Sequence, residues 1–153
     1  MLTLQEMTAT DFDHYIHIVV PAYAQDKIKS GAWKKEVALK LSEETFATHL
    51  PQQQETPDEY LYTILLNNQV IGYVWFHFNL VENDAAFLYD FLIIASHQNQ
   101  GYGTQAMTLI ENQARIAGAK TLALHVFAHN ERAVHVYQKN GFQMTDYSMA
   151  KKL

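Results

Sequence analysis

Residues 85–127 constrain the fold most, because two apolar segments there flank a glycine-bearing loop and an amphipathic helix. Residues 85–95 are almost all apolar and predict a buried strand, and residues 121–127 predict a second one. Between them, apolar residues at helical spacing predict a helix over residues 101–117, which Gly118 ends. A strand, a helix and a strand in this order form a right-handed parallel crossover, so we predict a mixed sheet.

The other segments add helices and further strands to this unit. A pattern similar to a capping box at residues 10–13 opens a first helix, which Pro21 should kink or split. We predict a second helix over residues 36–50, a hairpin over 60–78, a short helix over 130–139 and a final pair of strands over 142–153. No repeat or linker interrupts the order. We therefore expect one domain over residues 1–153, of class α/β (α+β), with a mixed central sheet flanked by helices.

Composition excludes several classes of protein. The chain has 153 residues, no cysteine and a formal net charge of −5. Without cysteine there is no disulfide or thiolate zinc site, and without a basic surplus a nucleic-acid partner is not expected. The first residues lack a signal-peptide pattern and no apolar run is long enough to cross a membrane, so we expect a cytoplasmic protein without a membrane partner. The eight histidines include His125, His129 and His135 but form no metal-binding pattern, so no metal is expected.

The loop between the first predicted strand and its helix predicts an anion site. It contains the run Gln98, Asn99, Gln100, Gly101, Tyr102 and Gly103, followed by Thr104. Glycines let backbone N–H groups approach an anion closely, and a helix N-terminus adds free N–H groups and partial positive charge. A plain strand-to-helix turn is the alternative. A dinucleotide site fits less well, because residues 96–100 separate the strand from Gly101 and no acidic residue follows at the required distance.

Two segments together resemble the GNAT acetyltransferases. The run HQNQGYGTQAM matches the acetyl-CoA loop of that family, written Q/R-x-x-G-x-G/A, with Gln98 leading. The run NERAVHVYQKNGF matches a second signature of the family, through Asn130, Ala133, Tyr137, Gly141 and Phe142. The hairpin with Gly72 and the order of elements also agree, so the resemblance covers nearly the whole chain. It implies the GNAT fold, with parallel strands around residues 85–95 and 121–127 that splay apart.

The resemblance also implies how acetyl-CoA is held. In GNAT proteins the pantetheine arm enters the gap between the splayed strands, so main-chain groups near Phe91, Ile93 and Ala95 should bond it. The loop residues 98–104 should bind the pyrophosphate. Asn130 is similar to the family residue that contacts the arm from the other side, and it is also a suitable helix N-cap.

Tyr137 resembles the general acid of the family. A departing thiolate needs a proton, and a phenol is a plausible donor. The competing interpretation is a core tyrosine on a short helix.

The attacking amine needs a base, and Asp90 is the candidate because it interrupts an apolar strand. Related enzymes often place Glu or His one residue earlier, where this chain has Tyr89. A water chain is an equal alternative for the base, and a structural role for Asp90 is another.

The sequence therefore predicts an N-acetyltransferase that moves an acetyl group from acetyl-CoA to a primary amine by direct attack in a ternary complex. The absence of cysteine favours the direct route over an acyl-enzyme. The acceptor is a small-molecule or peptide amine, and residues 23–59 should line its site. A homodimer is compatible with the sequence. The alternative function is a non-catalytic acyl-CoA-binding module, which would have no use for Tyr137.

Overall fold

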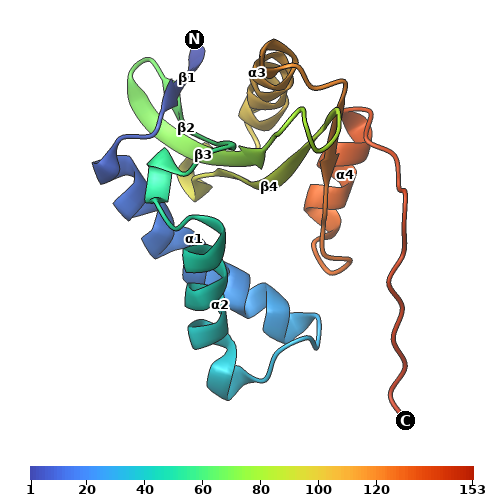
Figure 1. Cartoon of the computed structure of the whole chain (residues 1–153). Helices are drawn as coiled ribbons and strands as arrows, with labels where there is room; N and C mark the ends of the chain where they lie inside the picture. The colour runs from blue at the N-terminus through green and yellow to red at the C-terminus, as the bar shows by residue number, and fades with distance from the viewer.

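The computed structural model describes residues 1–153 and is built on one five-stranded sheet (Figure 1). The strands are β1 (Leu2–Glu6), β2 (Glu59–Leu66), β3 (Gln69–His77), β4 (Ala85–Ile93) and β5 (Thr121–Leu124), and they lie side by side in that order. The pairs from β1 to β4 are antiparallel, whereas β4 and β5 are parallel. The predicted fold class, a mixed sheet flanked by helices, is confirmed.

Helices cover both faces of this sheet (Figure 1). Helices α1 (Ala9–Lys29) and α2 (Lys35–His49) pack on one face, through a core that contains Tyr15, Phe46 and Trp75. Helix α3 (Tyr102–Ala117) packs on the other face, where Phe76 and Ile110 are fully buried. Helix α4 (Glu131–Lys139) lies at the rim of this second core, and short 3₁₀ turns occupy Gln53–Glu55 and Ala95–His97. None of the helices is both long and apolar enough to span a membrane.

Close backbone approach explains one glycine in the sheet. Gly72 on β3 faces β4, and a Cβ atom at this position would lie 2.3 Å from the Leu92 carbonyl oxygen. That distance is far below any real contact, so only glycine lets the two strands pair here.

The first part of the chain differs from the prediction in three respects. Strand β1 was not predicted, and its identity depends on pairing with β2 sixty residues away in the chain. Helix α1 runs without a break through the exposed Pro21, so of the predicted kink or split, the split is wrong. Its capping box joins Thr8 and Asp11 instead of starting at Thr10. The Asp11 N–H donates to Oγ1 of Thr8 at 3.1 Å, and the Thr8 N–H donates to Oδ2 of Asp11 at 3.2 Å.

The C-terminal segment also differs from the prediction. Residues 142–153 form no strand and run away from the rest of the molecule (Figure 1). The predicted pair of strands over residues 142–153 is therefore wrong, and β5 is an edge of the sheet.

Candidate active site

The two parallel strands separate at the centre of the molecule. Pairing between β4 and β5 runs only from Ala85 opposite Thr121 to Leu88 opposite Leu124, while β4 continues to Ile93. Phe91 and Ile93 lie opposite Val74 and Gly72, and the neighbouring Ile94 N–H donates to the Ile71 carbonyl at 2.8 Å. In that antiparallel register the main-chain groups of Phe91 and Ile93 point away from β3, toward the side where β5 has ended.

A β-bulge places two adjacent side chains of β4 on the same face at this point. The register shifts so that Trp75 faces Asp90 while Phe76 faces Leu88, which leaves Tyr89 as the extra residue. The Tyr89 ring stacks on Trp75 at 4.4 Å, and Asp90 accepts a hydrogen bond from Tyr15 of α1. Both side chains therefore face α1 and α2, directly beyond the last paired residue.

Asp90 is a partly buried carboxylate with an unusual proton affinity. Loss of solvent raises the pKa of Asp90 to about 6, against the opposing effect of hydrogen bonds from the Tyr15 hydroxyl and the Phe91 N–H. The Tyr15 hydroxyl lies 2.9 Å from Oδ2 of Asp90. Burial, and secondarily the Asp90 charge, holds the pKa of Tyr15 well above its ordinary value, so Tyr15 remains the donor of this bond.

Tyr137 lies on the inner face of α4, at the rim of the α3-side core. Its ring contacts Phe142 edge-on at 5.6 Å, and its hydroxyl makes no hydrogen bond within the protein. Burial, with a smaller contribution from the Asp90 charge, raises the pKa of Tyr137 to about 12. The charge of Asp90 on β4 therefore influences the proton affinity of Tyr137 on α4, although the two candidate catalytic groups come from different elements.

The loop before α3 has the geometry of an anion cradle. Asn99 and Gly101 both have positive φ, 62° and 83°, and Gly101 is the N-cap of α3 without any side-chain hydrogen bond to cap it. The first N–H groups of α3 are therefore free. A Cβ atom at Gly101 or Gly103 would project into open space, which leaves room for a ligand against the backbone. Tyr102 and Thr104 open the helix itself.

The two glutamines of this loop stabilise it from within. Gln98 Nε2 donates to the Ile93 carbonyl at 2.7 Å, and Gln100 Nε2 donates to the Ser96 carbonyl at 3.1 Å. The Ile93 carbonyl, predicted as a pantetheine contact, is thus bonded to Gln98. Ala95 lies beyond the end of β4 in a 3₁₀ turn, and its carbonyl accepts the Gln98 N–H.

Arg132 is a functional candidate that the sequence analysis missed. Its Nη1 donates to Oε1 of Gln98 at 3.1 Å, which brings a guanidinium from α4 to a loop that has no cation of its own. Asn130, two residues earlier, caps α4 by accepting the Ala133 N–H at 3.3 Å. Its amide nitrogen keeps its donors free, so capping and a ligand contact are compatible.

Aromatic side chains form a wall beside Asp90. Tyr23 contacts Phe46 and Phe127, with ring centroids 5.8 and 6.4 Å apart, and Phe46 in turn contacts Trp75. His129 bonds Asp26 at 2.9 Å, which ties the segment after β5 to α1. The predicted acceptor segment thus supplies Tyr23, Asp26 and Phe46 to this wall.

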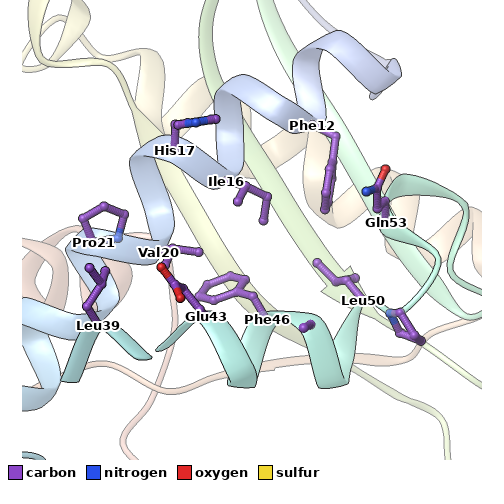
Figure 2. A pocket seen from close by; sticks show the side chains of 12 residues that line it. Phe12, Ile16, His17, Val20, Pro21, Leu39, Glu43, Phe46, Leu50 and Gln53 are labelled. Atoms are coloured by element: carbon purple, nitrogen blue, oxygen red, sulfur yellow. The ribbon is translucent and has the colours of Figure 1, made fainter. Parts of the chain in front are cut away.

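A separate cavity of about 540 Å³ lies between α1 and α2 (Figure 2). Its lining is mainly apolar and includes Phe12, Ile16, Val20, Phe46 and Leu50. Neither Asp90, Tyr137 nor any residue of the loop before α3 lines it. Only Phe46 belongs to both the cavity and the aromatic wall.

Comparison with known proteins agrees with this geometry. Residues 26–142 match the model of the Acetyltransferase (GNAT) family. The chain is 37% identical to the uncharacterised N-acetyltransferase YycN of Bacillus subtilis (strain 168), over 99% of both chains. The crystal structure of YycN superposes with a TM-score of 0.96, at 36% identity, covering 100% of this chain and 99% of YycN. The PaiA N-acetyltransferase of Thermoplasma acidophilum, solved with coenzyme A, shares the fold at 15% identity with a TM-score of 0.73, covering 97% and 93%.

Proposed function

Because the chain belongs to the GNAT acetyltransferase family, we propose that it transfers an acetyl group from acetyl-CoA to a primary amine by direct attack in a ternary complex. The observation that carries this proposal is the position of Asp90 and Tyr137. Asp90 follows the last residue of β4 that pairs with β5, and its charge adds to burial in raising the pKa of Tyr137 on α4, so the two groups lie in one region.

Binding of acetyl-CoA is supported by a structural relative of the same fold, the PaiA N-acetyltransferase, which was solved with coenzyme A. The pyrophosphate would be bound by the free N–H groups at the start of α3, over Gly101 and Gly103. Arg132 would supply a positive charge there, held in place by Gln98. The pantetheine arm would extend along β4, where Phe91 and the Ile93 N–H face the gap, with the Asn130 amide on the opposite side.

Asp90 is proposed as the base that takes a proton from the acceptor amine. An alkylamine of pKa ~10.4 is almost fully protonated at neutral pH, so its nitrogen must lose a proton before it can attack the thioester carbon. With a pKa of about 6, Asp90 is mostly ionised at neutral pH and yet more basic than an ordinary aspartate. The Tyr15 hydroxyl and the Phe91 N–H both donate to this carboxylate, and its remaining lone pairs would take the proton from the amine or from a water between them.

Tyr137 is proposed as the donor to the leaving sulfur. As the C–N bond forms and the C–S bond breaks, the sulfur becomes a thiolate that requires a proton or a strong hydrogen bond. A phenol of pKa about 12 is fully protonated at neutral pH, and its hydroxyl has no competing partner within the protein. Because such a phenol is a weak acid, its proton moves only as the C–S bond breaks, when negative charge accumulates on sulfur.

The acceptor is proposed to be a cationic amine. In the aromatic wall, the rings of Tyr23 and Phe127 are only partly buried and could contact a cation, and Asp26 and Asp90 carry negative charge in the same region. This wall is built largely from α1 and α2, the segment that resembles the acceptor side of other GNAT proteins.

An acceptor screen tests the proposal. Purified protein with acetyl-CoA is offered polyamines, amino acids, aminoglycosides and peptide N-termini, with free-thiol release as the readout and mass spectrometry to identify the acetylated atom. We expect thiol release that depends on an amine and yields an amide. Acetyl-CoA binding without turnover on any amine would instead support the acyl-CoA-binding module.

A further inference from the structure

The cavity of about 540 Å³ between α1 and α2 has a buried apolar floor and an exposed mouth. Its floor contains Phe12, Val20, Phe46 and Leu50, each of them less than a tenth exposed. Leu39, at the mouth, is 51% exposed although it is large and apolar. Figure 2 shows the side chains of Phe12 and Leu50 pointing toward one another across the gap. The volume lies within the range of ~300–1,000 Å³ that small-molecule sites have.

A buried hydrogen bond joins the two helices beside this cavity. The Ser42 hydroxyl of α2 donates to the Val20 carbonyl of α1 at 2.7 Å, and Ser42 is fully buried. Val20 itself lines the cavity. The two helices are therefore joined at the cavity wall by a bond that needs no ligand, and the cavity is formed before anything enters it.

Glu43 gives this apolar cavity a negative charge. Its carboxylate points from α2 into the gap, next to Val20 (Figure 2). Glu43 makes no hydrogen bond or ion pair, whereas the adjacent Glu44 pairs with Lys40 at 4.0 Å. A carboxylate without a partner, at the side of an apolar cavity, favours a ligand whose positive charge lies next to an apolar body.

The rest of the lining supplies no opposing lysine or arginine. His17 is the other ionisable residue there, and its Nδ1 donates to the Asp13 carbonyl at 2.7 Å. The Asp13 carboxylate lies 3.9 Å from the same nitrogen. An anionic ligand would thus meet the Glu43 charge without any lysine or arginine to neutralise it, so the lining selects against anions.

We propose that the cavity between α1 and α2 is a second ligand site, which binds an amphipathic amine. The ammonium group pairs with Glu43, and the alkyl or aryl body lies along Ile16, Phe46 and Leu50 toward Gln53. The residues that carry the proposed reaction do not line this cavity, so binding here requires neither acetyl-CoA nor acetyl transfer. Because Phe46 also belongs to the aromatic wall, a bound amine contacts the back of that wall.

Calorimetric titration of the full chain without acetyl-CoA tests the site. Octylammonium is the probe, and octanol and octanoate carry the same chain on a neutral and a negative head group. We expect saturable binding of one octylammonium per chain at low salt. Octanoate is expected to bind at least ~5-fold more weakly, and octanol between the two. The proposal is overturned if octylammonium does not bind, or if octanol or octanoate binds as tightly.

Three variants show whether this cavity is the place of binding. Ala47 is an exposed lining residue, so Ala47→Phe should fill the cavity without disturbing the core and weaken octylammonium binding at least ~10-fold. Glu43→Gln should weaken it roughly 2–5-fold and bring octanoate within about twofold of octylammonium. Glu44→Gln is the control, because it changes the net charge equally at a carboxylate outside the cavity. Full affinity in Ala47→Phe, or equal losses in Glu43→Gln and Glu44→Gln, overturns the proposal.

Methyl NMR on the wild type gives a second measurement that needs no variant. Octylammonium should shift the methyl signals of Ile16, Val20, Leu39 and Leu50, which line the cavity, and leave Leu124 on β5 unchanged. Shifts that instead map around Asp26 and Asp90 would place the amine in the proposed acceptor site and overturn the proposal.

Discussion

The Tyr15 hydroxyl of α1 donates a 2.9 Å hydrogen bond to the carboxylate of Asp90 on β4, between residues 75 positions apart in the chain. This bond joins a helix of the proposed acceptor wall to the strand beside the proposed acetyl-CoA gap. It lowers the pKa of Asp90, while loss of solvent raises it, and the balance lies at about 6. The proton affinity of the proposed base therefore depends first on its burial and second on this contact between α1 and β4.

Removing that hydroxyl should shift the pH dependence of the reaction. The bond favours the ionised carboxylate, so Tyr15→Phe should raise the pKa of Asp90 and move the acid limb of kcat/KM upward by roughly 0.5–1 pH unit. Tyr73→Phe is the matched control, because Tyr73 packs against Tyr15 without bonding Asp90. A pH–rate profile for each protein is the measurement. A wild type with no limb near pH 6 would point to a water chain as the base.

Replacing the carboxylate should stabilise the protein and slow the reaction. The folded-state pKa of Asp90 lies above its unfolded value, so the folded state binds more protons between about pH 4 and 6. Stability is lost as pH rises through that window. Asp90→Asn removes the free-energy cost of an ionised carboxylate at this buried position. The variant should raise the free energy of unfolding by about 1–2 kcal/mol at pH 7.5 but very little at pH 4. Thermal melts at both pH values, beside kcat, check this. An equal change in Tm at both pH values would contradict this link between stability and the ionised carboxylate.

Binding of acetyl-CoA should depend on the glycine at the start of α3. Gly101 has φ of +83° and open space where a side chain would project. Gly101→Val would place a branched side chain over the free N–H groups, so we expect at least ~10-fold weaker binding, or about 1.4 kcal/mol. Gly31→Val is the control, because Gly31 has φ of +80°, equally open surroundings and no place in the loop. Calorimetric titration compares the two, and equal losses would mean that backbone strain alone is responsible.

Arg132 should contribute an electrostatic part of the same affinity. Arg132→Gln removes the only cation that the structure brings to the loop through Gln98, so acetyl-CoA should bind roughly 3–10-fold more weakly. The dependence of affinity on salt should also become shallower. Arg115→Gln is the control, because Arg115 lies on the far part of α3 and bonds Asn112 and Glu111. An unchanged salt dependence in Arg132→Gln would remove Arg132 from the site.

Local signals in the sequence were enough to predict the centre of the fold. The predicted helix over 101–117 is α3 with Gly101 as its N-cap, because glycine and apolar spacing are properties of neighbouring residues. Contacts between distant residues were not accessible in this way. Tyr15 sits on a helix whose apolar spacing was read from other residues, and Arg132 reaches Gln98 only after α4 has packed.

The limits of the strands were harder to predict, because they too depend on contacts between residues that are distant in the chain. β1 is a strand because Leu2 pairs with Leu66, and no short-range pattern specifies that partner. The bulge that turns Tyr89 and Asp90 to one face depends on the register between β3 and β4. Residues 142–153 carry a strand pattern, yet no strand of their own chain pairs with them. The prediction of two strands there was wrong, because strand propensity alone does not form a strand without a neighbour to pair with.

The steady-state rate of Tyr137→Phe, measured beside the wild type on an accepted amine, tests the central claim most directly. The change keeps the ring that contacts Phe142 and removes only the hydroxyl proposed to protonate the leaving sulfur. Loss of a general acid typically costs ~10²–10⁴ in rate, and water can replace part of it. We predict that kcat falls at least about tenfold, with little change in acetyl-CoA affinity or in Tm. A Tyr137→Phe protein with full kcat would contradict the assignment of Tyr137 as the proton donor.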